Sequence, residues 1–319
     1  MEIDFQEAQN WLSNYKMLKL KELIILNSVH RPDLLYPFLY KMPNLEKLKL
    51  TSSYSGSLQS TNIGQHDRLR VVLQLKQLLI CSSKLKDLGF ERDQVLERLE
   101  LLKLRDCDNL CNLCPSSVSL SYLTCLKLKR CNGLKNLVAS STAKTMVQLK
   151  TMKVIDCRQV EQIVSNDGSE EGKGIKIVFS KLISIELVGL MNMTSFCGYK
   201  NCEFEFPLLE ILIVRTCPKM EKFSERGLIA PKLKDVYGVE GDKKAQWQWE
   251  GDLNDTIQEI FHDKVLFNLF NTISPNFMNF SYMGKKLKKH DWILQIHVFS
   301  NKALNGCTLR FYFFLIMFF

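Results

Sequence analysis

The chain has 319 residues, of which 46% are hydrophobic, enough for a continuous buried core, and its formal net charge is +9. Seven lysines and arginines stand against one acid after residue 263, so residues 1–263 carry only +3. Residues 1–263 therefore lack the strongly basic charge that is typical of nucleic-acid-binding proteins.

Residues 1–17 predict a short amphipathic lead-in. The chain begins with Met1-Glu-Ile-Asp-Phe-Gln-Glu, which is acidic and has no apolar signal segment. The 11 cysteines would indicate disulfides only in a secreted protein. We therefore predict a reducing, cytoplasmic compartment with free, buried thiols.

From residue 99 onward one spacing of apolar residues recurs, L-x-x-L-x-L-x-x-C-x-x-L-x-x-L. The first copy consists of Leu99, Leu102, Leu104, Cys107, Leu110 and Leu113. Three further complete copies carry the cysteine at Cys131, Cys157 and Cys217, and a fourth keeps the phase with Leu190 in its place.

Weaker copies extend the array toward both ends. With them, repeats begin at Leu20, Leu45, Leu75, Leu99, Leu123, Leu149, Leu182, Leu209 and Leu233. The intervals are 24 to 33 residues, close to the period of about 20–29 residues that characterises leucine-rich repeats. The sequence therefore predicts an array of such repeats.

Each L-x-L core predicts a short strand whose leucines point inward and whose intervening residues point outward. One repeat cannot bury its own leucines, so the repeats must stack. The predicted fold class is α/β, a leucine-rich-repeat solenoid (horseshoe) with a parallel β-sheet on the concave face. The variable remainder of each repeat is expected to cover the convex side.

Irregular intervals locate insertions and an end cap. Residues 51–66 are rich in serine and glycine, and residues 165–174 are polar and acidic, so both predict exposed loops. Residues 252–261 predict a short helix, capped by Asp252 or Asn254, that covers the open end of the core.

These features divide the chain into a lead-in (1–17), a solenoid with a C-terminal capping helix (18–262) and an irregular basic and apolar tail (263–319). The tail contains a run of four lysines within residues 285–289 and ends in nine apolar residues. Nine residues are too few to span a bilayer, which needs about 20. A non-native or disordered extension is the favoured interpretation, and a membrane-surface anchor is the alternative.

Sequence motifs for chemistry are weak. The glycine-rich stretch 168–174 has the wrong spacing for a phosphate-binding loop and precedes a strand-like segment at 175–179. Cys111 and Cys114 form a single C-x-x-C without a second ligand pair for zinc. The five histidines fall in predicted loops or the tail, so we predict no enzyme, no cofactor and no metal site.

The outward positions of the predicted strands are the informative surface. Stacking would align Lys103, Lys127 and Lys153 with Arg105 and Lys129 as a basic patch in the middle repeats. We predict a protein-binding face composed of Lys49, Lys103, Arg105, Lys127, Lys129, Lys153, Ile213, Arg215 and Tyr237. The alternative is that the lysines only keep an exposed sheet soluble and discourage association.

The repeat resembles the leucine-rich-repeat region of plant intracellular disease-resistance proteins of the coiled-coil, nucleotide-binding type. The resemblance covers residues 18–262 and is most specific in residues 149–163, 179–182, 206–212, 217–220 and 247–253. It implies a horseshoe that senses pathogen effectors or modified host proteins and restrains a neighbouring nucleotide-binding switch. That switch needs a phosphate-binding loop, which this sequence lacks, so the chain is predicted to be a fragment or a truncated relative.

The predicted function is protein recognition in plant innate immunity. The expected partner is an effector, a host protein or the nucleotide-binding domain of a resistance protein, without nucleic acid and without stable membrane-surface binding. The alternative is a substrate-recruiting adaptor of the F-box type, whose leucine-rich repeats also contain cysteines. An F-box helix bundle would distinguish it, and residues 1–17 are too short to contain one.

Overall fold

The computed structural model describes residues 2–4, 18–26, 42–51, 55–57, 74–81, 84–88, 96–166, 174–199, 202–226, 228–233, 235–237, 246–247 and 253–258. The chain divides into two units, residues 1–265 and 266–319, and all described residues belong to the first. The predicted tail of residues 263–319, with both of its interpretations, lies outside the described residues, as do residues 5–17 of the predicted lead-in.

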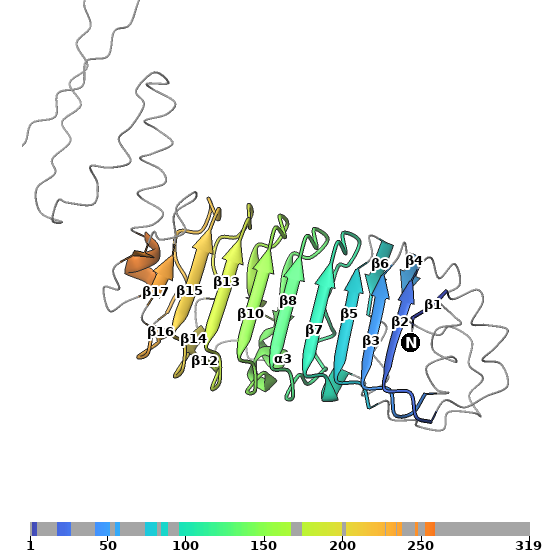
Figure 1. The fold of residues 1–319 in the computed structure, drawn as a ribbon. Coiled ribbons are helices and arrows are strands. Elements are labelled where there is room, and N and C mark those ends of the chain that lie inside the picture. The colour runs from blue at the N-terminus through green and yellow to red at the C-terminus, as the bar shows by residue number, and fades with distance from the viewer. Residues whose placement is uncertain are drawn as a thin grey trace, which may run out of the picture. The chain divides into compact units, whose positions relative to one another are not determined.

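The first unit is built on one eleven-stranded sheet with the order β1-β2-β3-β5-β7-β8-β10-β13-β15-β17-β18 (Figure 1). Its strands are β1 (Glu2–Asp4), β2 (Glu22–Leu26), β3 (Lys47–Thr51), β5 (Gln77–Cys81), β7 (Leu101–Arg105), β8 (Cys125–Lys129), β10 (Thr151–Ile155), β13 (Ser184–Val188), β15 (Ile211–Arg215), β17 (Asp235–Tyr237) and β18 (Gln246–Trp247). Every neighbouring pair from β1 to β17 is parallel, and β18 runs antiparallel to β17.

The strands form where the sequence places its L-x-L cores. In β8, Leu126 and Leu128 are buried, whereas Cys125, Lys127 and Lys129 are partly exposed. The same alternation occurs in β3, β5, β10 and β13, because successive side chains of a strand point to opposite faces. The weaker copies of the repeat at residues 20, 45, 75 and 233 form β2, β3, β5 and β17, so they are true members of the array.

The repeat positions fill one continuous hydrophobic core. Leu102, Leu126, Met152 and Leu212 are each at most 1% exposed. The cysteines of the four complete copies are also at most 1% exposed and belong to the same cluster of contacting side chains. The predicted solenoid of stacked leucine-rich repeats is confirmed.

Behind the main sheet lie short strands with little helix (Figure 1). The pairs are β4 (Ser55–Ser57) with β6 (Lys84–Asp87) and β9 (Asn136–Ala139) with β11 (Gln162–Ser165); a three-stranded sheet joins β12 (Ile175–Val178), β14 (Cys202–Glu205) and β16 (Leu228–Ile229). The helical elements with assigned bounds are η2 (Leu96–Arg98) and α3 (Ser140–Thr145). β4 lies inside the predicted loop 51–66, and β12 confirms the strand-like segment after the glycine-rich stretch.

Five phenylalanines fill the core between β13, β15 and the three-stranded sheet. The stacked rings of Phe196 and Phe223 are 4.6 Å apart, and those of Phe179 and Phe206 are 5.4 Å apart. Phe204 meets Phe196 edge-on at 5.3 Å. All five side chains are fully buried, so bulky rings take the place that smaller side chains have in the earlier repeats.

Residues 253–258 form a short helix at the C-terminal end of the described array. Leu253 and Ile257 are buried in the common core. Asn254 lies inside this helix, and its Oδ1 accepts hydrogen bonds from the backbone N–H groups of Phe223 and Ser224 at 2.9 and 3.0 Å. It therefore ties the helix to the last complete repeat, and Asp252, the other predicted capping residue, lies outside the described residues.

Candidate protein-binding surface

The outward residues of the parallel strands form two rows across the sheet, with the alignment that the repeat spacing predicts. The first row contains Lys49, Leu79, Lys103, Lys127, Lys153, Glu186, Ile213 and Tyr237. The second row contains Thr51, Cys81, Arg105, Lys129, Ile155, Val188 and Arg215. Strands in a sheet are about 4.8 Å apart, so neighbours in a row interact directly.

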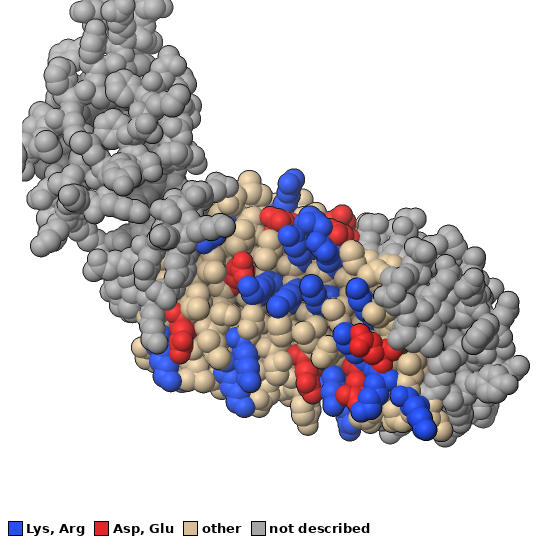
Figure 2. Space-filling model, viewed as in Figure 1, with Lys and Arg blue, Asp and Glu red and all other residues tan. Residues whose placement is uncertain are grey.

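Four basic residues on β7 and β8 form what we call the basic tract: Lys103, Arg105, Lys127 and Lys129. Lys103 and Arg105 are exposed, and Lys127 and Lys129 are half-buried. Within the described part of the chain, no carboxylate lies in ion-pair range of Lys103, Lys127 or Lys129. Figure 2 shows basic side chains gathered over these middle strands. The basic tract therefore presents positive charge to solvent.

Lys153 and Lys49, the other lysines of the predicted face, differ from the basic tract. Lys153 on β10 forms an ion pair with Glu186, which lies beside it on β13. Lys49 is separated from Lys103 by the apolar Leu79 on β5. Opposite charges that lie directly opposite each other on neighbouring strands attract. Lys153 and Glu186 occupy the same position in consecutive repeats, so this ion pair could have been predicted from the sequence, although our sequence analysis did not predict it.

Two glutamates form ion pairs with lysines at and beside the N-terminal strands β2, β3 and β5. Lys21 and Lys76 each lie 3.2 Å from a different oxygen of Glu46, and Lys47 lies 2.7 Å from Glu22. Hydrogen bonds from Lys21 and Lys76 lower the pKa of the Glu46 carboxyl. Near β2, β3 and β5, Figure 2 accordingly shows acidic side chains among the basic ones. Glu22 and Glu46 thus neutralise part of the positive charge here, whereas Lys49 on β3 has no ion pair among the described residues.

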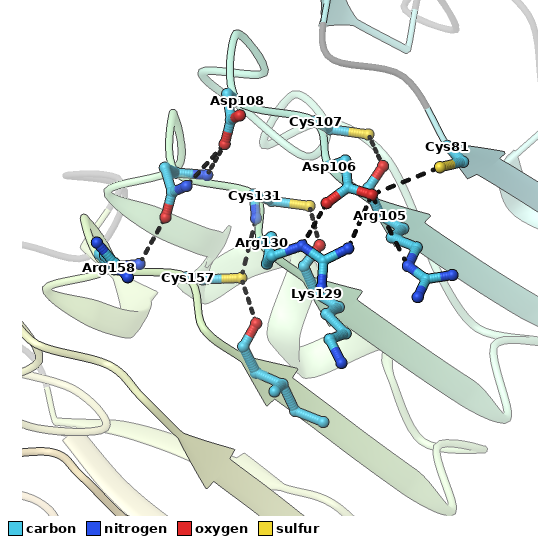
Figure 3. Close-up of polar contacts among 12 residues, drawn as sticks. Cys81, Arg105, Asp106, Cys107, Asp108, Lys129, Arg130, Cys131, Cys157 and Arg158 are labelled. Carbon is cyan, nitrogen blue, oxygen red and sulfur yellow. Dashed lines mark hydrogen bonds and ion pairs between the residues drawn. The ribbon is translucent and has the colours of Figure 1, made fainter. Parts of the chain in front are cut away.

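A second charged group lies where β7 and β8 end (Figure 3). Asp106 Oδ1 accepts a hydrogen bond from Arg130 Nε at 2.5 Å, and Asp106 Oδ2 accepts one from Arg130 Nη2 at 3.0 Å. The hydrogen bonds with Arg130 lower the pKa of Asp106, and a further one from the Cys81 thiol adds to this effect. Sequence analysis did not predict this two-point ion pair, which joins the residues that follow β7 and β8, the two strands that carry the basic tract.

The residue after each of β7, β8, β10, β13 and β15 adopts a left-handed backbone conformation. Asp106, Arg130, Asp156 and Thr216 have φ values between 50° and 56°, and Gly189 has φ 69°. The first three and Gly189 each donate their backbone N–H to a carbonyl of the next strand, at 2.7–3.0 Å. A Cβ on Gly189 would lie 2.5 Å from Asp156 Oδ1, so glycine is required there for close approach as well as for its φ.

Toward β15 the sheet face becomes apolar. Ile155 and Val188 continue the second row, and Ile211 and Ile213 lie on the outward face of β15. Arg215 ends the second row, and its Nε is buried without a hydrogen-bond partner. Tyr237 pairs with Ile213 in the register of β15 and β17.

Cysteines at the repeat position form a buried series of thiols. Cys107, Cys131, Cys157 and Cys217 each donate a hydrogen bond to the carbonyl two residues earlier, at 3.2–3.6 Å. The backbone N–H of Cys131 also donates to Cys157 Sγ at 3.4 Å (Figure 3). A hydrogen bond with Cys107 lowers the pKa of Cys131, but the bond with Cys157 and burial outweigh it and raise that pKa to about 12. This thiol therefore stays protonated.

In the described ranges, no group of three or more histidine, cysteine or acidic side chains is placed to hold a metal ion. Cys111 is exposed and Cys114 is half-buried, and burial raises the pKa of Cys114 to about 12. All five histidines lie outside the described residues.

The middle of the chain is similar to a known protein family. Residues 112–224 match the family model described as plant disease resistance protein RPS2-like, leucine-rich repeats. Neither the curated proteins nor the solved structures yield a match. None of the described helices has the length and hydropathy needed to cross a bilayer. Residues 112–224 are thus similar to the leucine-rich repeats of RPS2-like plant disease resistance proteins.

Proposed function

We propose that this chain is a protein-recognition module of plant innate immunity, which uses its sheet face to bind an acidic surface of a partner protein. The partner is an effector, a host protein or the nucleotide-binding domain of a resistance protein, and binding restrains a signalling domain. The proposed setting is the cytoplasm. The family match supports the immune context, while the alternative of an F-box adaptor gains no support from it.

The observation that carries this proposal is the basic tract. Its three lysines have no ion-pair partner among the described residues, and they lie on the adjacent strands β7 and β8, which pair in register. Lysines paired with glutamates, as at Glu46 and Glu186, would also keep the sheet soluble. Solubility alone therefore does not require lysines without an ion-pair partner. Unpaired charge of one sign attracts a surface of the opposite sign and accelerates its association.

The test is capture of proteins from plant tissue with the tagged full chain, followed by identification of the captured proteins and measurement of their affinities. The double variant Lys103→Glu, Lys127→Glu should bind a captured partner about tenfold more weakly, because two attractive contacts become repulsive. Raising the salt concentration should weaken wild-type binding in the same direction.

The matched control is Lys135→Glu, which changes the charge of an exposed lysine in the same repeat as Lys127 but outside the strands of the main sheet. It should leave binding unchanged. A partner whose affinity is the same for the wild type and for the double variant would exclude the basic tract as the binding surface.

A further inference from the structure

Arg215 has an unusual environment for a charged side chain. Among the described residues, its Nε is the one buried side-chain nitrogen or oxygen that has no hydrogen-bond partner. Arginine keeps its charge at all physiological pH values and has five N–H donors. Since buried donors in folded proteins are nearly always satisfied, an exception calls for a physical explanation.

The described neighbours of Arg215 on the sheet face include two apolar residues. Ile213 lies two residues earlier on the same face of β15, and Val188 lies directly opposite on β13. The acid of the neighbouring row, Glu186, is already bonded to Lys153. Arg215 therefore combines an unsatisfied, buried Nε with apolar neighbours among the described residues.

We infer that Arg215, together with Ile211 and Ile213, anchors an aspartate or glutamate side chain that a partner protein carries between apolar residues. A carboxylate can accept two hydrogen bonds from the Nε and Nη edge of a guanidinium, and this charge-assisted geometry is among the strongest in proteins. The side chain as a whole is half-buried, so its torsions can turn this edge toward a bound segment. This inference rests on the proposed function, because it identifies the chemistry of the partner for the same face.

The position of Arg215 relative to the basic tract sets the spacing of charges in the partner. Three strand-to-strand steps separate β8 from β15, through β10 and β13. At about 4.8 Å per step they span roughly 14 Å, which about four residues of extended chain cover. The matching segment has an acidic cluster and, about four residues further on, a single acid between apolar side chains.

The probe is a fluorescein-labelled peptide, Glu-Asp-Glu-Gly-Ser-Leu-Asp-Leu, which carries this spacing, and a second peptide with the reversed order. Fluorescence anisotropy measures the affinity of each peptide for the full chain. The peptide in the preferred direction should bind, and replacement of its second aspartate by asparagine should weaken binding about tenfold. The variant Arg215→Gln should weaken binding of the aspartate peptide by the same factor and leave binding of the asparagine peptide unchanged.

The controls separate this inference from the proposed function. Arg158→Gln alters another arginine, which is exposed and lies outside the main sheet, and should leave the affinity unchanged. Binding that falls with Lys103→Glu, Lys127→Glu but not with Arg215→Gln would overturn the anchor and leave the basic tract supported. A wild-type chain that binds neither peptide would also overturn the anchor, and capture from plant tissue would still test the basic tract independently.

Thermal unfolding of Arg215→Met supplies a readout that does not depend on any ligand. Methionine keeps much of the side-chain length and removes the unsatisfied donor, so the Tm should stay the same or rise. A Tm lower by several degrees, with Arg158→Met unchanged, would show that the guanidinium supports the fold and would overturn its role as an anchor.

Discussion

The repeats that contain β7, β8 and β10 and those that contain β13 and β15 place different side chains on both sides of one parallel sheet. Inside, buried thiols occur in both regions, at Cys107, Cys131 and Cys157 in the earlier repeats and at Cys217 in the later ones, but only the later repeats add the phenylalanine cluster. Outside, the earlier repeats carry the basic tract, and the later ones carry isoleucine and valine. The stacking of the strands is the same in both regions.

This contrast separates what the fold requires from what it leaves free. The interior must be filled at close to crystal density, and both thiols with leucines and clustered rings achieve this. The outward rows contribute little to the core, so their composition can change from basic to apolar without altering the sheet. A change that follows the strands in register is therefore better attributed to a bound partner than to folding.

The largest expected effect concerns the interior of the later region. Phe196 contacts four other rings and is fully buried, so Phe196→Ala should lower the free energy of unfolding by about 3–5 kcal/mol through lost burial and a new cavity. Urea unfolding followed by circular dichroism measures the loss. Phe196→Leu should lose less, and equal losses for both variants would contradict the dependence on cavity size.

A smaller effect is expected in the thiol region. Cys157→Ala removes a buried donor to the Ile155 carbonyl and leaves the N–H of Cys131 without its sulfur acceptor, which should cost about 1–2 kcal/mol. The same urea measurement applies, with the exposed Cys111→Ala as a control that should change stability by less than about 0.5 kcal/mol. If Cys157→Ala were as damaging as Phe196→Ala, the two interiors would contribute equally despite their different volumes.

Most of the solenoid could be predicted from sequence because its information is local and repeated. The spacing of Leu102, Leu126, Met152 and Leu212 specifies which side chains are buried, and all four are buried. The same period fixes the register that aligns Lys103 with Lys127. The second layer was harder to predict, because β9 and β11 contain only the last position of the repeat, Leu137 and Ile163, and their pairing depends on the neighbouring repeat.

Details of the candidate surface depend on side-chain torsions that the repeat does not encode. Lys153 belongs to the same row as Lys127, yet its charge is taken up by Glu186. The unsatisfied Nε of Arg215 is likewise invisible in sequence, where the residue is only one more cation at an outward position. Sequence could therefore predict which residues share the outward rows of the sheet, and the structure was needed to separate free charge from paired charge.

The ion pair between Asp106 and Arg130 offers the finest distinction between the two regions, because Gly189 and Thr216 occupy the equivalent positions in the later repeats. The folded-state pKa of Asp106 lies below its ordinary value, so the pair stabilises the protein at pH values above the ordinary aspartate pKa of about 3.9. This contribution is lost as the pH falls through the lowered folded-state pKa, since the carboxyl then becomes protonated.

Asp106→Asn should therefore lower the free energy of unfolding by only about 0.5–1 kcal/mol at neutral pH, since both side chains of the pair are more than a third exposed. The difference between the wild type and this variant should shrink as the pH is lowered from about 5 through the aspartate range. Urea unfolding at a series of pH values measures it, with the exposed Glu221→Gln as the control. A difference that stayed constant across this range would mean that the hydrogen-bond geometry of the Asp106 side chain, and not its charge, holds the strand ends of the middle repeats together.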